Sequence, residues 1–222
     1  MTKQAILFDC DGTLVDSEYV CAQSDISILA EFGIHYASVH EFLDEFMGVA
    51  NGKIVRILNE RHGKDIPVEW FVEEYERRAL PLIPEGLGYF KESVAYVKTL
   101  AERGIPVAVI SNGKKKVVEL ELKVAGYDMF GDNIFTVEDS PNPKPAPDLY
   151  LLAAKTMGVD PVDCIVVEDS STGASAGLAA GMRVMGYHGY SRTPEKARAA
   201  LEQAGCHRII NSLSDLDAEL RG

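Results

Sequence analysis

Short runs of apolar residues recur along the chain and alternate with segments of helical periodicity. Short runs that are apolar throughout are typical of strands buried on both faces of a parallel sheet. Four of the helical segments stop just before a glycine, which is a common helix end. The alternation predicts an α/β fold, with a Rossmann-like, doubly wound parallel sheet as its core. The predicted strands are residues 5–8, 107–110, 134–137, 164–167, 183–186 and 208–210, and the glycine-stopped helices are 91–103, 114–125, 148–157 and 172–180.

The stretch between the first two predicted strands breaks this rhythm. It predicts helices only, at residues 17–32, 40–47, 52–61 and 68–80. A crossover between parallel strands needs one helix, so this segment is too long to be a simple connection. We therefore expect a helical cap, residues 17–84, inserted into an α/β core formed by residues 1–16 and 85–222.

Composition and charge limit the partners that the chain can have. The 222 residues include 34 acidic and 22 basic side chains, a formal net charge of -12. Nucleic acids and anionic lipid surfaces attract clustered lysine and arginine, so neither is expected to bind. The chain shows no signal-peptide pattern, no apolar run of about 18 residues and no CxxC pair. We expect a cytoplasmic, monomeric protein that acts on a small molecule.

Two aspartates follow the first predicted strand, where residues 9–13 have the sequence DCDGT. In open parallel sheets ligands bind at the carboxyl ends of strands, which is where Asp9 and Asp11 lie. A calcium-binding EF-hand loop is excluded, because Thr13 and Val20 occupy its fifth and twelfth positions. A structural pair that only caps a turn stays open, as it does for any aspartate before glycine.

Three further strand ends carry polar groups suited to a phosphate or a metal ion. Ser111 and Asn112 follow the second strand and open a helix, where a hydroxyl and the helix N-terminus favour phosphate. Lys144 lies after the third strand in a loop with three prolines, which would hold its charge in place. Glu168 and Asp169 end the fourth strand, and two adjacent carboxylates imply a bound cation. Each set also fits a helix cap or a surface loop, but their common edge favours one site.

These four sets together resemble the haloacid dehalogenase superfamily. The resemblance covers nearly the whole chain and rests on residues 9–16, 111–113, 144–148 and 168–173. Cap insertion after Asp16 is similar to the branch that contains β-phosphoglucomutase and small sugar-phosphate phosphatases. The resemblance implies Mg²⁺-dependent hydrolysis of a phosphate ester, with Asp9 as the nucleophile that forms an aspartyl phosphate. It makes Asp11 the general acid and base.

The resemblance also implies the metal and substrate contacts. Mg²⁺ would be held by Asp9, the Asp11 carbonyl and Asp169, with Glu168 either a direct or a water-mediated partner. The cap loop 48–53 resembles the specificity loop of the family. We expect Lys53 in this loop to bind the distal part of the substrate, with an ordinary solvated lysine as the alternative. The implied phosphate- and substrate-binding residues are Thr13, Ser111, Asn112, Lys144, Asn51 and Lys53.

Two cap residues differ from the mutases of this branch. Asn51 stands where those enzymes carry arginine, and Cys21 where they carry a hinge histidine. An intramolecular exchange must hold a second phosphate and delay water, so both differences favour a phosphatase. The sequence DCDGTLVDSE looks like that of bacterial phosphatases acting on 6-phosphogluconate or similar sugar phosphates. A β-phosphoglucomutase-type mutase is the enzymatic alternative, and a phosphoacceptor or regulatory remnant is the non-enzymatic one.

Overall fold

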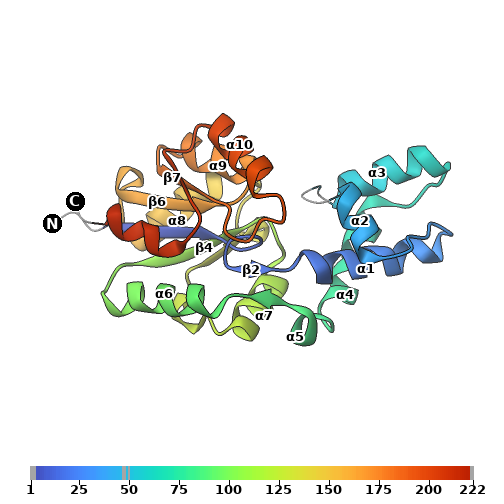
Figure 1. The fold of residues 1–222 in the computed structure, drawn as a ribbon, viewed down its shortest axis with the longest axis horizontal. Helices are drawn as coiled ribbons and strands as arrows, with labels where there is room; N and C mark the ends of the chain where they lie inside the picture. The colour runs from blue at the N-terminus through green and yellow to red at the C-terminus, as the bar shows by residue number, and fades with distance from the viewer. Residues whose placement is uncertain (1–3, 47–48, 50, 221–222) are drawn as a thin grey trace. The chain divides into compact units, whose positions relative to one another are not determined.

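The chain divides into two compact units, each described here by itself. The computed structural model describes residues 4–46, 49 and 51–220 (Figure 1). The α/β core unit comprises Met1–Asp16 and Tyr89–Gly222, and the helical unit comprises Ser17–Gly88. The sequence places the second boundary after residue 84, whereas the helical unit continues to Gly88. It does so because the short helix α5 (Ile83–Gly86) packs against α1 (Glu18–Glu31).

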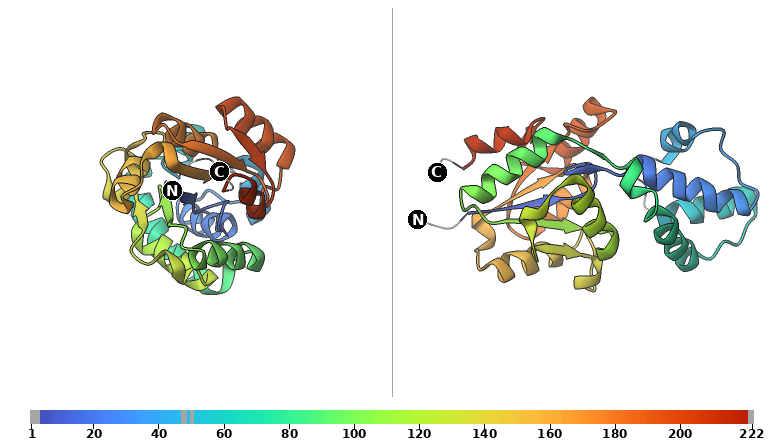
Figure 2. Two further views of the ribbon diagram at one scale, coloured as in Figure 1. Left: turned by 90° about the vertical axis from the view of Figure 1, so that its left-hand side faces the viewer. Right: turned by 90° about the horizontal axis from the view of Figure 1, so that it is seen from below.

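A six-stranded sheet, parallel throughout, forms the centre of the core unit (Figure 2). Its strand order is β5-β4-β1-β6-β7-β8, so the chain moves outward in one direction from β1 and then in the other. This confirms the predicted doubly wound α/β fold and places the carboxyl ends of β4, β1 and β6 side by side. The strands are β1 (Ala5–Asp9), β4 (Val107–Ser111), β5 (Ile134–Thr136), β6 (Cys164–Glu168), β7 (Arg183–Tyr187) and β8 (Arg208–Ile210).

Both faces of the central strands are buried, which explains why these strands are apolar at every position. On one face Leu7 and Val166 belong to a cluster with Leu149 and Ala174 of the covering helices. On the other face Phe8 contacts Phe130 edge to face, with ring centroids 6.2 Å apart. Burial of whole strands leaves polar side chains only at their ends, where the sheet meets a ligand site.

The four predicted core helices begin and end within one residue of their predicted bounds. Helix α7 stops at Gly126 and α8 at Gly158, whose φ angles of 87° and 65° are left-handed. Glycine reaches that conformation without a Cβ penalty, so the glycine stops were informative. The core helices are α6 (Lys91–Glu102), α7 (Lys115–Ala125), α8 (Asp148–Met157), α9 (Ser171–Ala179) and α10 (Pro194–Ala204), the last of which was not predicted.

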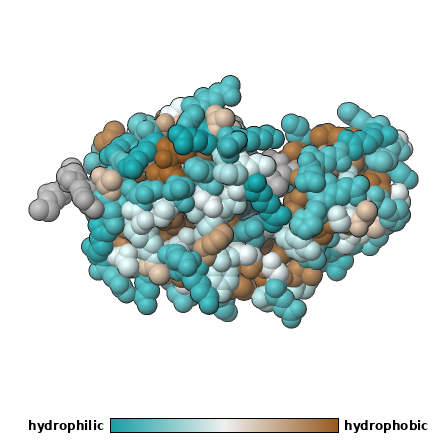
Figure 3. Space-filling view, in the orientation of Figure 1, coloured by the Kyte–Doolittle hydropathy of each residue, from teal (hydrophilic) through white to brown (hydrophobic). Residues whose placement is uncertain are grey.

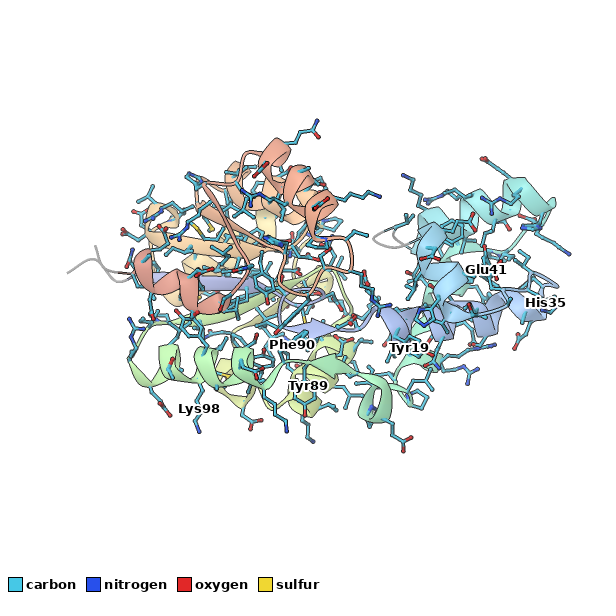
Figure 4. All side chains as sticks on the ribbon, in the orientation of Figure 1. Tyr19, His35, Glu41, Tyr89, Phe90 and Lys98 are labelled. Carbon is cyan, nitrogen blue, oxygen red and sulfur yellow. The ribbon has the colours of Figure 1, made fainter. Side chains whose placement is uncertain are left out.

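Two short strands at the junction of the units were also missed. Strand β2 (Val15–Asp16) pairs with β3 (Gly88–Tyr89) in a separate two-stranded sheet. Each strand is only two residues long, which is too short to show a periodic pattern, so the sequence does not predict it. Phe90, labelled beside Tyr89 in Figure 4, then stacks on Tyr190 with ring centroids 3.6 Å apart.

The helical unit contains its own hydrophobic core. Ile28, Phe42, Leu58 and Phe71 are among its buried residues and come from four different helices. Hydrophilic side chains cover much of the visible surface of the molecule (Figure 3). The remaining helices of the unit are α2 (Val39–Phe46), α3 (Asn51–His62) and α4 (Val68–Ala79). Met47, the predicted end of the second helix, lies outside the described residues.

Every helix in residues 4–46, 49 and 51–220 is too short or too polar to span a lipid bilayer.

Candidate active site

The amino group of Lys144 lies at the carboxyl ends of three neighbouring strands. Its Nζ atom donates to Asp9 Oδ1 at 2.7 Å, to Glu168 Oε1 at 2.6 Å and to the carbonyl oxygen of Ile110 at 2.7 Å. The lysine side chain is only 4% exposed. Three acceptors satisfy all three ammonium donors, so this buried charge is fixed in position.

The backbone of Lys144 is held by a side chain from the neighbouring strand end. Asn112 accepts a hydrogen bond from the Lys144 N–H at 2.9 Å and donates to its carbonyl at 3.1 Å. The loop is closed further by Asn142, which donates to Asp148 at 2.8 Å. The sequence predicts that Asn112 binds the phosphate, and in the structure its side-chain amide also positions the backbone of Lys144. The second N–H of its side-chain amide and its backbone N–H would remain for an anion.

Glu168 is completely buried, and both of its carboxylate oxygens accept hydrogen bonds from protein groups. Oε1 accepts from Lys144 and from the Tyr150 hydroxyl at 2.9 Å, while Oε2 accepts from the Ser170 hydroxyl at 3.0 Å. A Cβ atom at Gly173 would lie 1.6 Å from Glu168 Oε1, so only glycine fits there. Glu168 therefore orients Lys144. Sequence reasoning missed Tyr150, because its helix presents it as an ordinary buried aromatic.

The turn after β1 brings the backbone against Asp169. Gly12 has a φ angle of 81°, and a Cβ atom there would lie 2.1 Å from Asp169 Oδ2. Glycine is required for both reasons. Oxygen atoms of Asp9, Glu168 and Asp169 all lie within 4.8 Å of one another. The strand ends that the sequence predicted to meet therefore do meet, around a group of three carboxyl groups.

The carboxyl groups of Asp9, Glu168 and Asp169 could carry three negative charges, whereas Lys144 supplies one positive charge. Burial, together with Glu168, raises the pKa of Asp9 to about 8, although Lys144 acts to lower it. Burial and the neighbouring Asp9 raise the pKa of Asp169 well above its usual value. One ammonium cannot offset three carboxylates, and a divalent cation would lower both pKa values. Oxygen ligands of this kind fit Mg²⁺, so the donor set of the site is suited to that ion.

Another buried acidic side chain, Glu121, lies near Asp11. Glu121 on α7 is 2% exposed, and its carboxylate, the Asp11 carboxylate and the Cys10 thiol lie within 4.8 Å of one another. Burial, with Asp11 as the next cause, raises the pKa of Glu121 well above its usual value. The sequence analysis did not identify Glu121, since a glutamate in an amphipathic helix normally faces water.

Thr13 and Ser111 are both buried beside the aspartates. Among the described residues, the Thr13 hydroxyl has no hydrogen-bond partner. Ser111 is 1% exposed, and its hydroxyl accepts from the N–H of Gly113 at 2.9 Å. An unpaired buried hydroxyl is unfavourable for folding, so Thr13 retains a hydrogen-bonding capacity that suits its predicted contact with a ligand.

The two predicted cap residues belong to the helical unit. Asn51 begins α3 and donates to Asp25 Oδ1 at 3.1 Å. Lys53, two residues further along, has an exposed side chain. Gly48 and Ala50 of the predicted cap loop lie outside the described residues.

The family model for haloacid dehalogenase-like hydrolases matches residues 6–187, which include every proposed site residue of the core unit. The chain belongs to this family. A 6-phosphogluconate phosphatase from Escherichia coli K12 is 33% identical over 182 residues, covering 82% of this chain and 80% of that protein. Hexitol phosphatase A from the same organism is 30% identical and covers 87% of each chain. The resemblance seen in the sequence is thereby confirmed.

A solved structure agrees with this assignment. The crystal structure of a HAD family hydrolase from Deinococcus radiodurans R1, with bound phosphate and sodium, is 34% identical. It superposes with a TM-score of 0.76 and covers 98% of this chain and 94% of its own. Together with the phosphatases among its curated relatives, this makes the chain a phosphoric monoester hydrolase of the haloacid dehalogenase-like family.

Proposed function

We propose that this hydrolase is a Mg²⁺-dependent phosphatase that acts on a small phosphorylated sugar or sugar acid through a phosphorylated Asp9. The observation that carries the proposal is the buried Lys144 ammonium 2.7 Å from Asp9 Oδ1, with Asp169 beside it. The relatives named for 6-phosphogluconate and for hexitol phosphates support the substrate class.

In the first half-reaction, an Asp9 oxygen forms a bond to phosphorus while the bond from phosphorus to the ester oxygen breaks. A carboxylate cannot approach a phosphate dianion unless nearby positive charge offsets the repulsion. Lys144 supplies one such charge at a fixed position. Mg²⁺ bound by Asp9, Asp169 and the Asp11 carbonyl would supply the rest, and Glu168 would keep Lys144 oriented.

Asp11 provides the proton transfers on either side of the intermediate. Its carboxyl group donates a proton to the departing alcohol oxygen, and the resulting carboxylate then accepts a proton from the attacking water. Water adds to phosphorus, the bond from phosphorus to Asp9 breaks, and inorganic phosphate leaves. Both aspartates thereby return to their starting states.

Metal dependence tests this proposal most directly. We expect steady turnover of an aryl phosphate with Mg²⁺ and its loss when a chelator removes the ion, because the carboxylates then repel the phosphate. Release of aryl alcohol should be followed over many enzyme equivalents. A single equivalent released, with phosphate left on the protein, would instead indicate a phosphoacceptor. A mutase is less well supported, since Asn51 and Cys21 lack the positive charge for a second phosphate.

Replacing Asp11 with asparagine should slow turnover by roughly 10² to 10⁴-fold, the usual contribution of a general acid and base. Mg²⁺ affinity should stay nearly constant, because the proposed ligand is the Asp11 backbone carbonyl. Titration calorimetry with Mg²⁺, alongside aryl phosphate kinetics, checks both halves of this expectation. Joint loss of metal binding and activity would make the side chain a ligand.

A further inference from the structure

A pocket of the core unit lies between the start of α6 and the segments that follow β7 and β8. Its volume is about 530 Å³, which is in the usual range for sites that bind small molecules. Four aromatic side chains contribute to its wall, namely Phe90, Tyr96, Tyr187 and Tyr190. None of the proposed catalytic, phosphate-binding or metal-binding residues is among the described residues that line it. The pocket is therefore a candidate for a second binding site.

The aromatic side chains of this pocket fix one another in position. Tyr190 stacks on Phe90 with ring centroids 3.6 Å apart, and it contacts Tyr187 at an interplanar angle of 88°. The Tyr190 hydroxyl also shares a hydrogen bond with Ser93 of α6. A Cβ atom at Gly189 would lie 2.4 Å from the Tyr187 hydroxyl, so only glycine lets the chain pass there. The aromatic wall is thus preformed, and Phe90 keeps 43% of its surface exposed.

The charge of the pocket is negative. Glu92 is the one charged side chain in the described lining, which contains no lysine, arginine or histidine. Burial raises the pKa of Tyr190, and the negative charge of Glu92 acts in the same direction. The carboxylate is therefore close enough to influence the aromatic wall. An anion in this pocket would be repelled by Glu92 and would find no counter-charge among the described lining residues.

Aromatic rings and a carboxylate together favour a positively charged ligand. The face of an aromatic ring attracts a cation that lies within about 6 Å of its centroid. Alkylated ammonium ions suit such a wall, because their charge is spread over apolar methyl groups that also contact the rings. A metal ion would need several oxygen ligands, whereas the described lining supplies a single carboxylate. A neutral polyol would contact the rings but would gain nothing from the charge of Glu92.

We propose that this pocket binds a small alkylated ammonium ion, with the aromatic wall around its methyl groups and Glu92 as its counter-charge. All of the described lining residues belong to the core unit. The phosphatase mechanism uses none of them, so binding here does not depend on the proposed function. The ligand is a cation, which separates this site from one for the phosphorylated substrate.

Choline and its neutral carbon analogue 3,3-dimethylbutanol form a matched pair of probes, because they have the same shape and differ in charge. Titration calorimetry with the whole chain, at an ionic strength held constant with sodium chloride, measures the affinity of each. We expect choline to bind roughly tenfold more tightly or more, the combined effect of several ring faces and one carboxylate. Equal affinities would indicate an apolar pocket that does not recognise charge and would overturn the proposal. Undetectable binding of choline would overturn it as well.

Variants then assign choline binding to this pocket. Glu92→Gln should weaken it about threefold, the size of an exposed ion-pair interaction. Phe90→Leu keeps an apolar side chain without a ring face and should also weaken it about threefold. Both residues are exposed, so both variants should fold. The matched control is Glu102→Gln, which removes an exposed carboxylate at the other end of α6 and should leave choline affinity unchanged.

A purely structural role for Glu92 predicts a different result. Glu92 lies in the first turn of α6, where a carboxylate stabilises a helix through its dipole. If that were its whole role, Glu92→Gln would lower the melting temperature and leave the affinity for choline unchanged. Unchanged affinity in either Glu92→Gln or Phe90→Leu would therefore overturn the assignment of the ammonium ion to this pocket.

Discussion

An Asp9→Asn variant should lose at least about 99% of its turnover, the largest effect expected from any conservative change in this protein. The asparagine amide cannot form the bond to phosphorus and is a weaker metal ligand than a carboxylate. Folding should be retained, because Lys144 keeps its hydrogen bonds to Glu168 and to the Ile110 carbonyl. Aryl phosphate kinetics in Mg²⁺, with a thermal melt of each protein, measure both properties.

Asp132→Asn is a suitable control, since Asp132 is an exposed aspartate of the same unit. It should retain full activity. Turnover of the Asp9→Asn enzyme above about one per cent of wild type would argue against covalent catalysis by this residue. A trap for phosphorylated protein, applied to wild type and variant, would then show whether any aspartate carries phosphate.

Lys144→Met should cause the largest loss of stability. Methionine is similar in length but leaves the carboxyl groups of Asp9 and Glu168 buried without their shared counter-charge. Breaking a buried ion pair by removing one partner lowers the free energy of unfolding by roughly 3 to 5 kcal/mol. Urea unfolding of the two proteins in the absence of metal measures this difference.

The matched control for that variant is Lys155→Met. Lys155 is exposed on α8, so its replacement should change the free energy of unfolding by at most about 0.5 kcal/mol. A similarly small change for Lys144→Met would mean that the neighbouring carboxyl groups are neutral in the folded protein. The proposed role of Lys144 as a charge beside the nucleophile would then fail.

The strands and their ends could be predicted because the buried sheet imposes a simple rule on the sequence. Strands covered on both faces must be apolar throughout, so the first polar residue after each run marks its carboxyl end. Asp9, Ser111 and Glu168 were found in this way. Helix α10 was missed, although it has a proline at its start and a glycine after its last residue. Those signals were present in the sequence.

The internal contacts of the site could not be predicted, because they join residues that are far apart in the chain. Nothing local shows that Asn112 binds the backbone of Lys144, or that Tyr150 donates to Glu168. Glu121 resembles a surface residue until the fold places it near Asp11. Sequence motifs identified the groups that carry the chemistry, whereas the groups that orient them required the three-dimensional structure.

The pairing of β2 with β3 bears on how this protein could diversify. The helical unit leaves the core after Asp16 and the chain returns at Tyr89, so its two ends are held together by neighbouring strands. The unit also has a separate hydrophobic core. An insertion with adjacent ends and independent packing can be exchanged for another without changing the strand connections of the sheet. Recombination at these two points would give chimaeras that keep one α/β core and differ in the helical unit.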